Sequence, residues 1–313
     1  MYDSDLFTTL SRLCILWPVM VAIGLTMLII ASIAFISINM CLFVVLPCFA
    51  IWLFLRTYYG PTWFSQIMHW IGTQMASVSP AHNLDPLPAG QQAIYSCHPH
   101  GLIAAAPYIH YTLVRGVSTM TTQFVVNFPL IRHIRSALSV IDSNKSAVDA
   151  HLGAGKSLTV ILGGAREALA TEPHKMRLCA DRRGIFELSI KHRVPIVPVL
   201  TYGENEMFAV KVSWKGILGR FQLWFYEHFH GVWAFPNIVE IYKWLRGDIT
   251  LRTHTAPPLW PAAGEDWMAL RRHYIVALET LYDKTRPDDY APTIEWISSS
   301  TSIAELPVAA NYA

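Results

Sequence analysis

Tyr95-Ser96-Cys97-His98-Pro99-His100-Gly101 is the stretch that decides how this 313-residue chain is expected to fold. The residues before it, 92–97, are mostly apolar and predict a short strand, whereas residues 101–115 predict an apolar helix. Both histidines therefore fall on a strand-to-helix turn, at the positive end of a helix dipole. Pro99 fixes its own φ and restricts His98, which holds the rings in place. Because imidazole titrates near neutral pH, a histidine held there is a candidate general base.

Strands and helices alternate along the chain on either side of this turn. Further strands are predicted at residues 122–127, 139–141, 158–162, 194–200 and 248–253. Further helices are predicted at residues 130–138, 144–152, 182–193 and 264–282. This alternation predicts an α/β fold, a sheet with helices on both faces. Function in such sheets gathers where strands end in turns, so we expect the histidine turn and Gly163–Glu167 to converge.

The N-terminal part of the chain has the character of a membrane segment. No charged residue lies between Arg12 and Arg56, a run of 43 residues. One helical span needs about 20 residues, so the run predicts a transmembrane hairpin with its break near residues 37–39. Arginine at both flanks predicts that both ends face the cytosol. A single long tilted helix and a hairpin that re-enters without crossing are the alternatives.

The expected organisation is a cytosolic N-terminus at residues 1–11, a transmembrane hairpin at 12–56, a catalytic α/β domain at 57–291 and a loosely ordered tail at 292–313. Only 15% of the residues are charged and the mean hydropathy is +0.32, so the chain is not expected to be freely soluble. A net charge of +2 without a basic arm predicts no binding to nucleic acid. Five cysteines without paired spacing predict neither a disulfide framework nor a zinc site. Residues 211–246, rich in aromatic and basic side chains, fit either an interfacial segment or a pair of core helices.

Five ordered blocks of the sequence resemble the type-2 diacylglycerol acyltransferase family, which includes monoacylglycerol and wax-alcohol acyltransferases. The blocks are His98–Gly101, Pro129–Arg132, Gly163–Glu167, Arg183–Phe186 and Val197–Glu206, and the resemblance covers about residues 12–285. It implies a membrane-anchored glycerolipid-acyltransferase-like domain that esterifies diacylglycerol to triacylglycerol, with monoacylglycerol or a long-chain alcohol as alternative acceptors. It also implies acyl-CoA as co-substrate, no bound cofactor, and an endoplasmic reticulum membrane or lipid droplet location with the catalytic domain facing the cytosol. A homo-oligomer is compatible with it.

The chemistry expected at the turn is general-base catalysis. His100 is expected to take the proton of the acceptor alcohol while its oxygen attacks the thioester, and His98 to shape the turn or contact substrate, although the two roles could be exchanged. Many glycerolipid acyltransferases orient the histidine with an aspartate five residues on, but Ile103 and Ala105 occupy those positions here. Glu167 is therefore the expected orienting carboxylate for the His100 ring. Backbone N–H groups near Gly101 are expected to stabilise the oxyanion.

Further substrate contacts are expected from several residues of the same blocks. Four arginines could meet the phosphates of acyl-CoA: Arg132, Arg166, Arg182 and Arg183. The remaining expected contacts are Gly101, where the missing side chain allows close approach, together with Gly163, Gly164, Glu204 and Asn205. The spacing of the Gly203–Glu206 block does not reveal its chemical role.

Parts of the sequence also fit other kinds of site. His98 and His100 could open a metal site, but no further ligands follow them closely, and no metal is expected. Cys97 could be a nucleophile, yet strand alternation should turn its side chain away from His98. Residues 150–157 match a relaxed phosphate loop, but a helix precedes and a strand follows, the reverse of what that loop needs. A membrane-tethered lipid hydrolase and a membrane scaffold are the alternative function classes; no Gly-x-Ser-x-Gly elbow supports the first.

Overall fold

The computed structural model describes residues 46, 62–77, 79–82, 87–88, 90–101, 104–127, 138–207, 216–232, 243 and 246–300. The chain divides into two units, residues 1–59 and 60–313, and every described residue except Leu46 belongs to the second. The predicted hairpin at 12–56 lies, Leu46 apart, outside the described residues, as does the Pro129–Arg132 block. Within the described residues, no helix has both the length and the apolar character needed to cross a bilayer.

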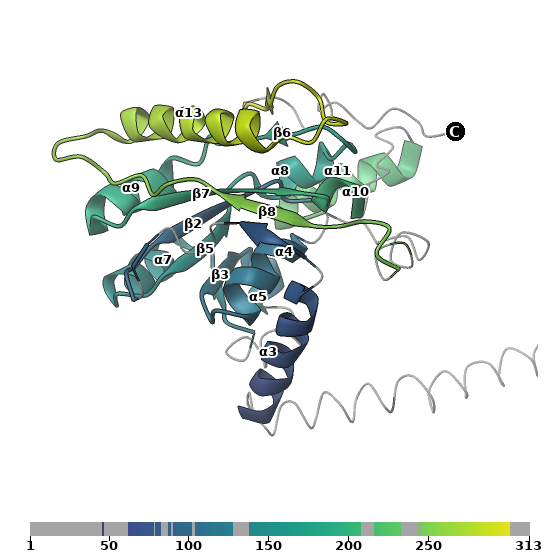
Figure 1. Cartoon of the computed structure of the whole chain (residues 1–313), viewed down its shortest axis with the longest axis horizontal. Coiled ribbons are helices and arrows are strands. Elements are labelled where there is room, and N and C mark those ends of the chain that lie inside the picture. The colour runs from purple at the N-terminus through teal and green to yellow at the C-terminus, as the bar shows by residue number, and fades with distance from the viewer. Residues whose placement is uncertain are drawn as a thin grey trace, which may run out of the picture. The chain divides into compact units, whose positions relative to one another are not determined.

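A seven-stranded, mostly parallel sheet forms the centre of the second unit (Figure 1). The strands are β1 (Ala81–His82), β2 (Ile94–His98), β3 (Ser118–Thr121), β4 (Val140–Asp142), β5 (Leu158–Ile161), β7 (Ile196–Tyr202) and β8 (Arg252–Thr255). Their order is β1-β8-β7-β2-β5-β3-β4, and only β7 and β8 pair antiparallel. The predicted α/β fold is therefore confirmed, with β2 at the centre between β5 and β7.

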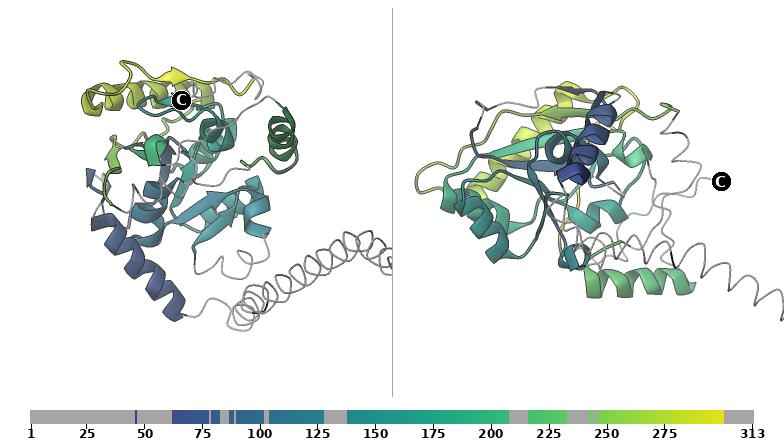
Figure 2. Two further views of the ribbon diagram at one scale, coloured as in Figure 1. Left: turned by 90° about the vertical axis from the view of Figure 1, so that its right-hand side faces the viewer. Right: turned by 90° about the horizontal axis from the view of Figure 1, so that it is seen from below.

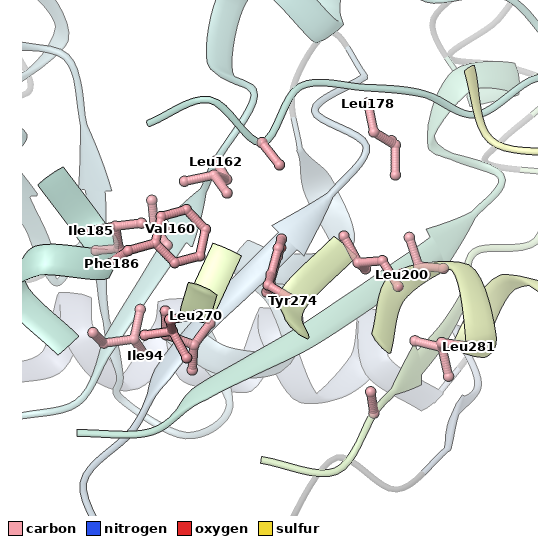
Figure 3. Close-up of a cluster of buried hydrophobic side chains, with 14 of the residues drawn as sticks. Ile94, Val160, Leu162, Leu178, Ile185, Phe186, Leu200, Leu270, Tyr274 and Leu281 are labelled. Atoms are coloured by element: carbon pink, nitrogen blue, oxygen red, sulfur yellow. The ribbon is translucent and has the colours of Figure 1, made fainter. Parts of the chain in front are cut away.

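Successive side chains of β2 point to opposite faces of the sheet, as the strand period requires. Ile94 packs into the larger core, which is formed with helices α7 (Lys145–Gly153), α9 (Arg183–His192) and α13 (Trp267–Thr285) (Figure 3). Tyr95 and Cys97 pack on the other face against Tyr111 of η2 (Tyr108–Leu113), a π-helix next to α3 (Thr62–Ser77). In Figures 1 and 2, α13 and α3 lie on opposite sides of the sheet.

Side-chain caps fix where two of the predicted helices begin. Asn144 precedes α7 and its side chain accepts a hydrogen bond from the backbone N–H of Ser146 at 3.0 Å. Asp266 precedes α13 and accepts from the N–H of Ala269 at 2.7 Å. The helix predicted at residues 264–282 therefore begins at Trp267, after this cap, and ends at Thr285.

The prediction of a strand at residues 122–127 is wrong. The strand is β3, which ends at Thr121, and Gln123–Asn127 forms the short helix α5. A short apolar run fits a strand or a buried helix equally well, and tertiary contacts decide between them. Here the ring of Phe124 packs on Phe225 and Phe229 of α11 (Gly216–Phe229), with ring centroids 5.5 and 4.7 Å apart.

Three other elements differ from the prediction. In place of one helix from Gly101, the described residues form α4 (Ala105–Pro107) and then η2. The last sheet strand, β8, begins at Arg252 rather than Asp248. The start of the tail is ordered, since β9 (Glu295–Trp296) pairs with β6 (Arg177–Leu178) and Ile297 is buried. Composition at 292–300 did not reveal this pairing, because its partner lies more than a hundred residues earlier.

Candidate active site

The histidine turn and Glu167 meet because they follow neighbouring parallel strands. β2 ends at His98 and β5 ends at Ile161, so both chains leave the sheet at the same edge. β5 continues through Gly163 into α8 (Gly164–Leu169), whose first turn carries Glu167. A Cβ on Gly163 would overlap the Glu167 carboxyl group, so only glycine leaves room for that side chain to fold back. The predicted convergence of the two blocks is confirmed.

The Glu167 carboxylate is buried, with 1% of the residue exposed, and accepts three hydrogen bonds. Oε1 accepts from Nδ1–H of His98 at 2.6 Å and from the backbone N–H of Cys179 at 2.7 Å. Oε2 accepts from the backbone N–H of His100 at 3.0 Å. The expectation that Glu167 holds the ring of His100 is therefore wrong: it holds the ring of His98 and the backbone of His100.

The side chain of His98 is fully enclosed, with both ring nitrogens bonded inside the protein. The residue has 0% exposure, and its Nε2 lies 2.8 Å from the hydroxyl of Tyr274 on α13. His98 therefore has no ring nitrogen left for a substrate in this arrangement. Glu167, His98 and Tyr274 form a continuous buried hydrogen-bond network, which we call the Glu167–His98–Tyr274 network.

The ring of His100, in contrast, is only partly buried and lines a cavity. Its Nδ1 lies 2.8 Å from the carbonyl oxygen of Gly101. A carbonyl can only accept, so Nδ1 carries the hydrogen and the neutral ring keeps its lone pair on Nε2. Burial, opposed by the Gly101 carbonyl and the Glu167 charge, lowers the pKa of the His100 imidazole below its usual 6.5. The ring is therefore mostly neutral at pH 7, as a general base must be.

Two adjoining cavities lie at this edge of the sheet. The cavity that contains His100 has a volume of about 510 Å³ and a largely apolar wall, including Met120, Val125, Val140, Ile161 and Val232. The second has a volume of about 800 Å³ and a more polar wall, including Gln123, Asn127, Asn144 and His228. Arg182 and His230 line both cavities, so the two spaces meet beside them.

The arginines expected to bind the phosphates of acyl-CoA lie in different surroundings. Arg182 lines both cavities, and a Cβ on Gly164, whose φ is +54°, would lie 2.6 Å from the Arg182 guanidinium. Arg166 donates to the carbonyl of Ser298 at 3.5 Å, and Arg183 pairs with Glu187 at 2.6 Å. Neither of these two lines the cavity that contains His100. Arg132 lies outside the described residues.

The Gly203–Glu206 block supports the turn from behind. The Glu204 carboxylate accepts from the N–H groups of Ala105 and Ala106 at 3.2 and 2.6 Å, which caps α4. A Cβ on Gly101, where φ is +53°, would lie 2.9 Å from the carbonyl oxygen of Glu204. Asn205 donates to the carbonyl of Lys175 at 2.7 Å. These contacts are structural, and none of them faces the His100 cavity.

Glu204 gives a prediction for stability against pH. Burial raises the pKa of this carboxyl from 4.5 to about 7. The folded state therefore binds the proton more tightly than the unfolded state, so the stabilisation is fully present below pH 4.5 and lost as pH rises through 7. We expect Glu204→Gln to remove a pH-dependent loss of about 3 kcal/mol in the free energy of unfolding. If the free energies of unfolding of the two proteins changed in parallel between pH 4.5 and 8, this prediction would be contradicted.

The structure also bears on the other kinds of site that the sequence suggested: a cysteine nucleophile, a phosphate loop and a metal site. Cys97 packs on the face of the sheet opposite His98, as predicted, and burial raises the pKa of its thiol well above 9.0, which disfavours a thiolate nucleophile. Helix α7 precedes residues 154–157 and strand β5 follows them. This confirms the predicted order of elements, which is the reverse of that around a phosphate loop. In the described part of the chain, no group of three or more His, Cys, Asp or Glu side chains is placed to hold a metal ion.

Sequence reasoning missed several residues of the site. Tyr274 lies 176 positions from its partner His98, and the cavity wall includes Tyr108, Thr119 and His230. For Tyr274 a signal existed, because a tyrosine on the core face of a helix needs a hydrogen-bond partner for its hydroxyl. Nothing in the local sequence indicates the cavity residues, since contacts across the fold bring them together.

Known proteins resemble this chain over much of its length. Residues 33–236 match the sequence model of the family described as diacylglycerol acyltransferase. Diacylglycerol O-acyltransferase 2B of Umbelopsis ramanniana is 25% identical over 232 residues, 63% of this chain and 64% of that protein. Acyl-CoA wax alcohol acyltransferase 2 of Homo sapiens is 24% identical over 225 residues, 62% of this chain and 67% of that protein.

This chain is also similar to a third curated protein and to one solved structure. 2-acylglycerol O-acyltransferase 1 of Homo sapiens is 27% identical over 155 residues, 45% of this chain and 43% of that protein. The crystal structure of a 1-acyl-sn-glycerophosphate acyltransferase from Thermotoga maritima aligns with a TM-score of 0.48 and 13% identity, over 81% of this chain and 94% of that one. The matches span between about two fifths and two thirds of the length of these three curated relatives. Because the family match covers well over half of the sequence, the chain belongs to the diacylglycerol acyltransferase family.

Proposed function

We propose that this protein is an acyl-CoA-dependent O-acyltransferase that esterifies diacylglycerol to triacylglycerol, with His100 as its general base. The observation that carries the proposal is the difference between the two histidines. His98 is buried with both ring nitrogens bonded, whereas His100 lines a cavity with a lone pair on Nε2. Of these two histidines, His100 is the one placed to take a proton from an alcohol bound in the cavity.

The reaction follows from that placement. The acceptor hydroxyl gives its proton to Nε2 of His100 while its oxygen attacks the carbonyl carbon of the thioester. The tetrahedral intermediate then collapses, the C–S bond breaks, and the CoA sulfur receives the proton from the imidazolium. The Glu167 charge favours that imidazolium, because it acts on His100 to raise its pKa. The backbone N–H of His100 donates to Glu167, so we assign the oxyanion to the backbone N–H of Gly101, the next residue of the turn.

The two cavities suit the two parts of acyl-CoA. The apolar wall of the His100 cavity accepts the acyl chain, and the more polar second cavity accepts the nucleotide end. Arg182, where the cavities meet, is the arginine best placed to bind a phosphate. No bound cofactor takes part in this scheme, since acyl-CoA is consumed as a substrate.

The proposed setting is a membrane. The uncharged run between Arg12 and Arg56 anchors the protein in the endoplasmic reticulum as a hairpin, with the catalytic domain on the cytosolic side. Helix α11 supports contact with lipid, because Ile217 is 74% exposed and Trp224 is 46% exposed on a helix whose last turn lines the second cavity through Tyr226, His228 and Phe229. A lipid droplet surface offers the same chemistry, and both substrates carry long acyl chains that partition there.

The acceptor is tested with membranes that contain the protein, supplied with labelled acyl-CoA and with diacylglycerol, monoacylglycerol or hexadecanol. We expect labelled triacylglycerol as the main product, above membranes prepared without the chain. Preferential labelling of diacylglycerol or of a wax ester would move the acceptor to one of the alternatives. Labelled free fatty acid alone would indicate hydrolysis of the thioester in place of transfer, and no transfer to any acceptor would leave the lipid hydrolase or a scaffold.

A further inference from the structure

Tyr274, on α13, contacts His98 beneath the candidate active site, from the core side of the sheet. Its side chain is fully buried among the core residues beneath β2 (Figure 3). Its hydroxyl lies 2.8 Å from Nε2 of His98 and 2.6 Å from Oγ of Ser96. Both partners are on β2 and two residues apart, which places their side chains on the same face of the strand.

The hydrogen bonds of this network run in one direction. Nδ1 of His98 must donate to the Glu167 carboxylate, which only accepts, and a ring that carries its single hydrogen on Nδ1 accepts at Nε2. The Tyr274 hydroxyl then donates to Nε2, and Ser96 donates to the tyrosine oxygen. Burial raises the pKa of the Tyr274 phenol well above 10.0, so the hydroxyl keeps the proton that it donates. Each donation polarises the next toward the single carboxylate.

That carboxylate also binds the backbone of the proposed base. Oε1 of Glu167 takes the His98 bond, and Oε2 takes the N–H of His100. We propose that Tyr274 is a positioning residue, which holds the ring of His98 at Nε2 and, through Glu167, the turn that presents His100 to the cavity. This inference rests on the proposed function of His100. Tyr274 itself touches no substrate.

A role in packing alone makes a different prediction. The ring of Tyr274 packs edge-on to Phe186 at a centroid distance of 5.6 Å, and phenylalanine would keep this contact. Tyr274→Phe therefore removes the hydroxyl and leaves Nε2 of His98 without a donor. A buried hydrogen bond of this kind accounts for about a tenfold change. We expect Tyr274→Phe to lower kcat by about tenfold, with the KM for acyl-CoA unchanged within about twofold.

Tyr282→Phe is the matched control. Tyr282 is also buried on α13, and its hydroxyl donates to the carbonyl of Ala291 at 2.6 Å, outside the network. We expect it to keep the wild-type kcat within about twofold, and Tyr274→Phe to have no further effect in a His98→Gln background. The proposal would be overturned if kcat fell equally in the two phenylalanine variants, or if Tyr274→Phe kept the wild-type kcat. It would also be overturned if Tyr274→Phe lowered kcat by about a further tenfold in the His98→Gln background.

A spectroscopic readout separates this inference from the proposed function. In detergent-solubilised protein with ¹⁵N-labelled histidine, Tyr274→Phe is expected to shift the ring resonances of both His98 and His100, and Tyr282→Phe neither. A His100 ring that is unchanged in Tyr274→Phe would overturn the positioning role even if the wild type transfers acyl groups. Shifted His100 signals in a protein that esterifies no acceptor would keep the network and reject the proposed function.

Discussion

His100→Gln is expected to lower kcat for acyl transfer by about a thousandfold, within the range that general bases contribute. Glutamine fills a similar volume and can still hydrogen-bond, but it cannot accept a proton at neutral pH. The lost group is the Nε2 lone pair that faces the cavity, since Nδ1 is bonded to the Gly101 carbonyl. Initial rates of labelled product formation at saturating acyl-CoA measure the effect.

Cys97→Ala is the control for this prediction. Its thiol lies on the other face of β2, against Tyr95 and Tyr111, so it does not reach the cavity. We expect this variant to keep kcat within about threefold, allowing for the small cavity that the substitution leaves. A His100→Gln protein with more than a tenth of the wild-type rate, or a Cys97→Ala protein as inactive as His100→Gln, would contradict the assignment of His100.

Glu167→Gln is expected to lower both stability and activity. The carboxylate offers only acceptors to three donors, namely Nδ1–H of His98 and the N–H groups of His100 and Cys179. An amide NH₂ in place of either oxygen would face a buried donor. Leaving such groups unsatisfied costs about 3 kcal/mol in the free energy of unfolding. We also expect kcat to fall about a hundredfold, because the turn that carries His100 loses its anchor.

Chemical denaturation followed by tryptophan fluorescence measures the stability change, with Glu206→Gln as the control. Glu206 also accepts a backbone N–H, from His174 at 2.6 Å, and a hydroxyl, from Tyr290 at 2.9 Å. It lines a separate cavity with His174 and Tyr290. We expect Glu206→Gln to lower the free energy of unfolding by about 1 kcal/mol and to leave the activity unchanged. A Glu167→Gln protein as stable as Glu206→Gln would show that the carboxylate does not organise the turn.

The central elements of the fold could be predicted because their signals are local. β5 and β7 are dense apolar runs, and α7 and α9 have helical period close to the predicted bounds. The prediction at residues 122–127 was wrong because six residues of mixed polarity carry no decisive period, and the contacts of Phe124 with the rings of α11 settle their conformation. The order of strands around β2 depends on contacts between distant segments.

The candidate site was predicted in its parts but not in its connections. The sequence placed His98, His100 and Glu167 at one edge of the sheet, because each follows a predicted strand. It could not tell which ring Glu167 would hold. The fold back of the Glu167 side chain over Gly163 decides that, and no spacing rule expresses it. The fourth partner, Tyr274, comes from a helix near the end of the chain.

The measurement that tests the central claim most directly is the pH dependence of kcat/KM for acyl transfer by solubilised wild-type protein between pH 4.5 and 8. Because the pKa of His100 is lowered from 6.5, we expect a plateau at neutral pH and a single acid limb whose midpoint lies below 6.5. Protein returned to pH 7 should regain its activity, which separates titration from unfolding. A rate that is constant or rises toward pH 4.5 would contradict a neutral His100 acting as the base.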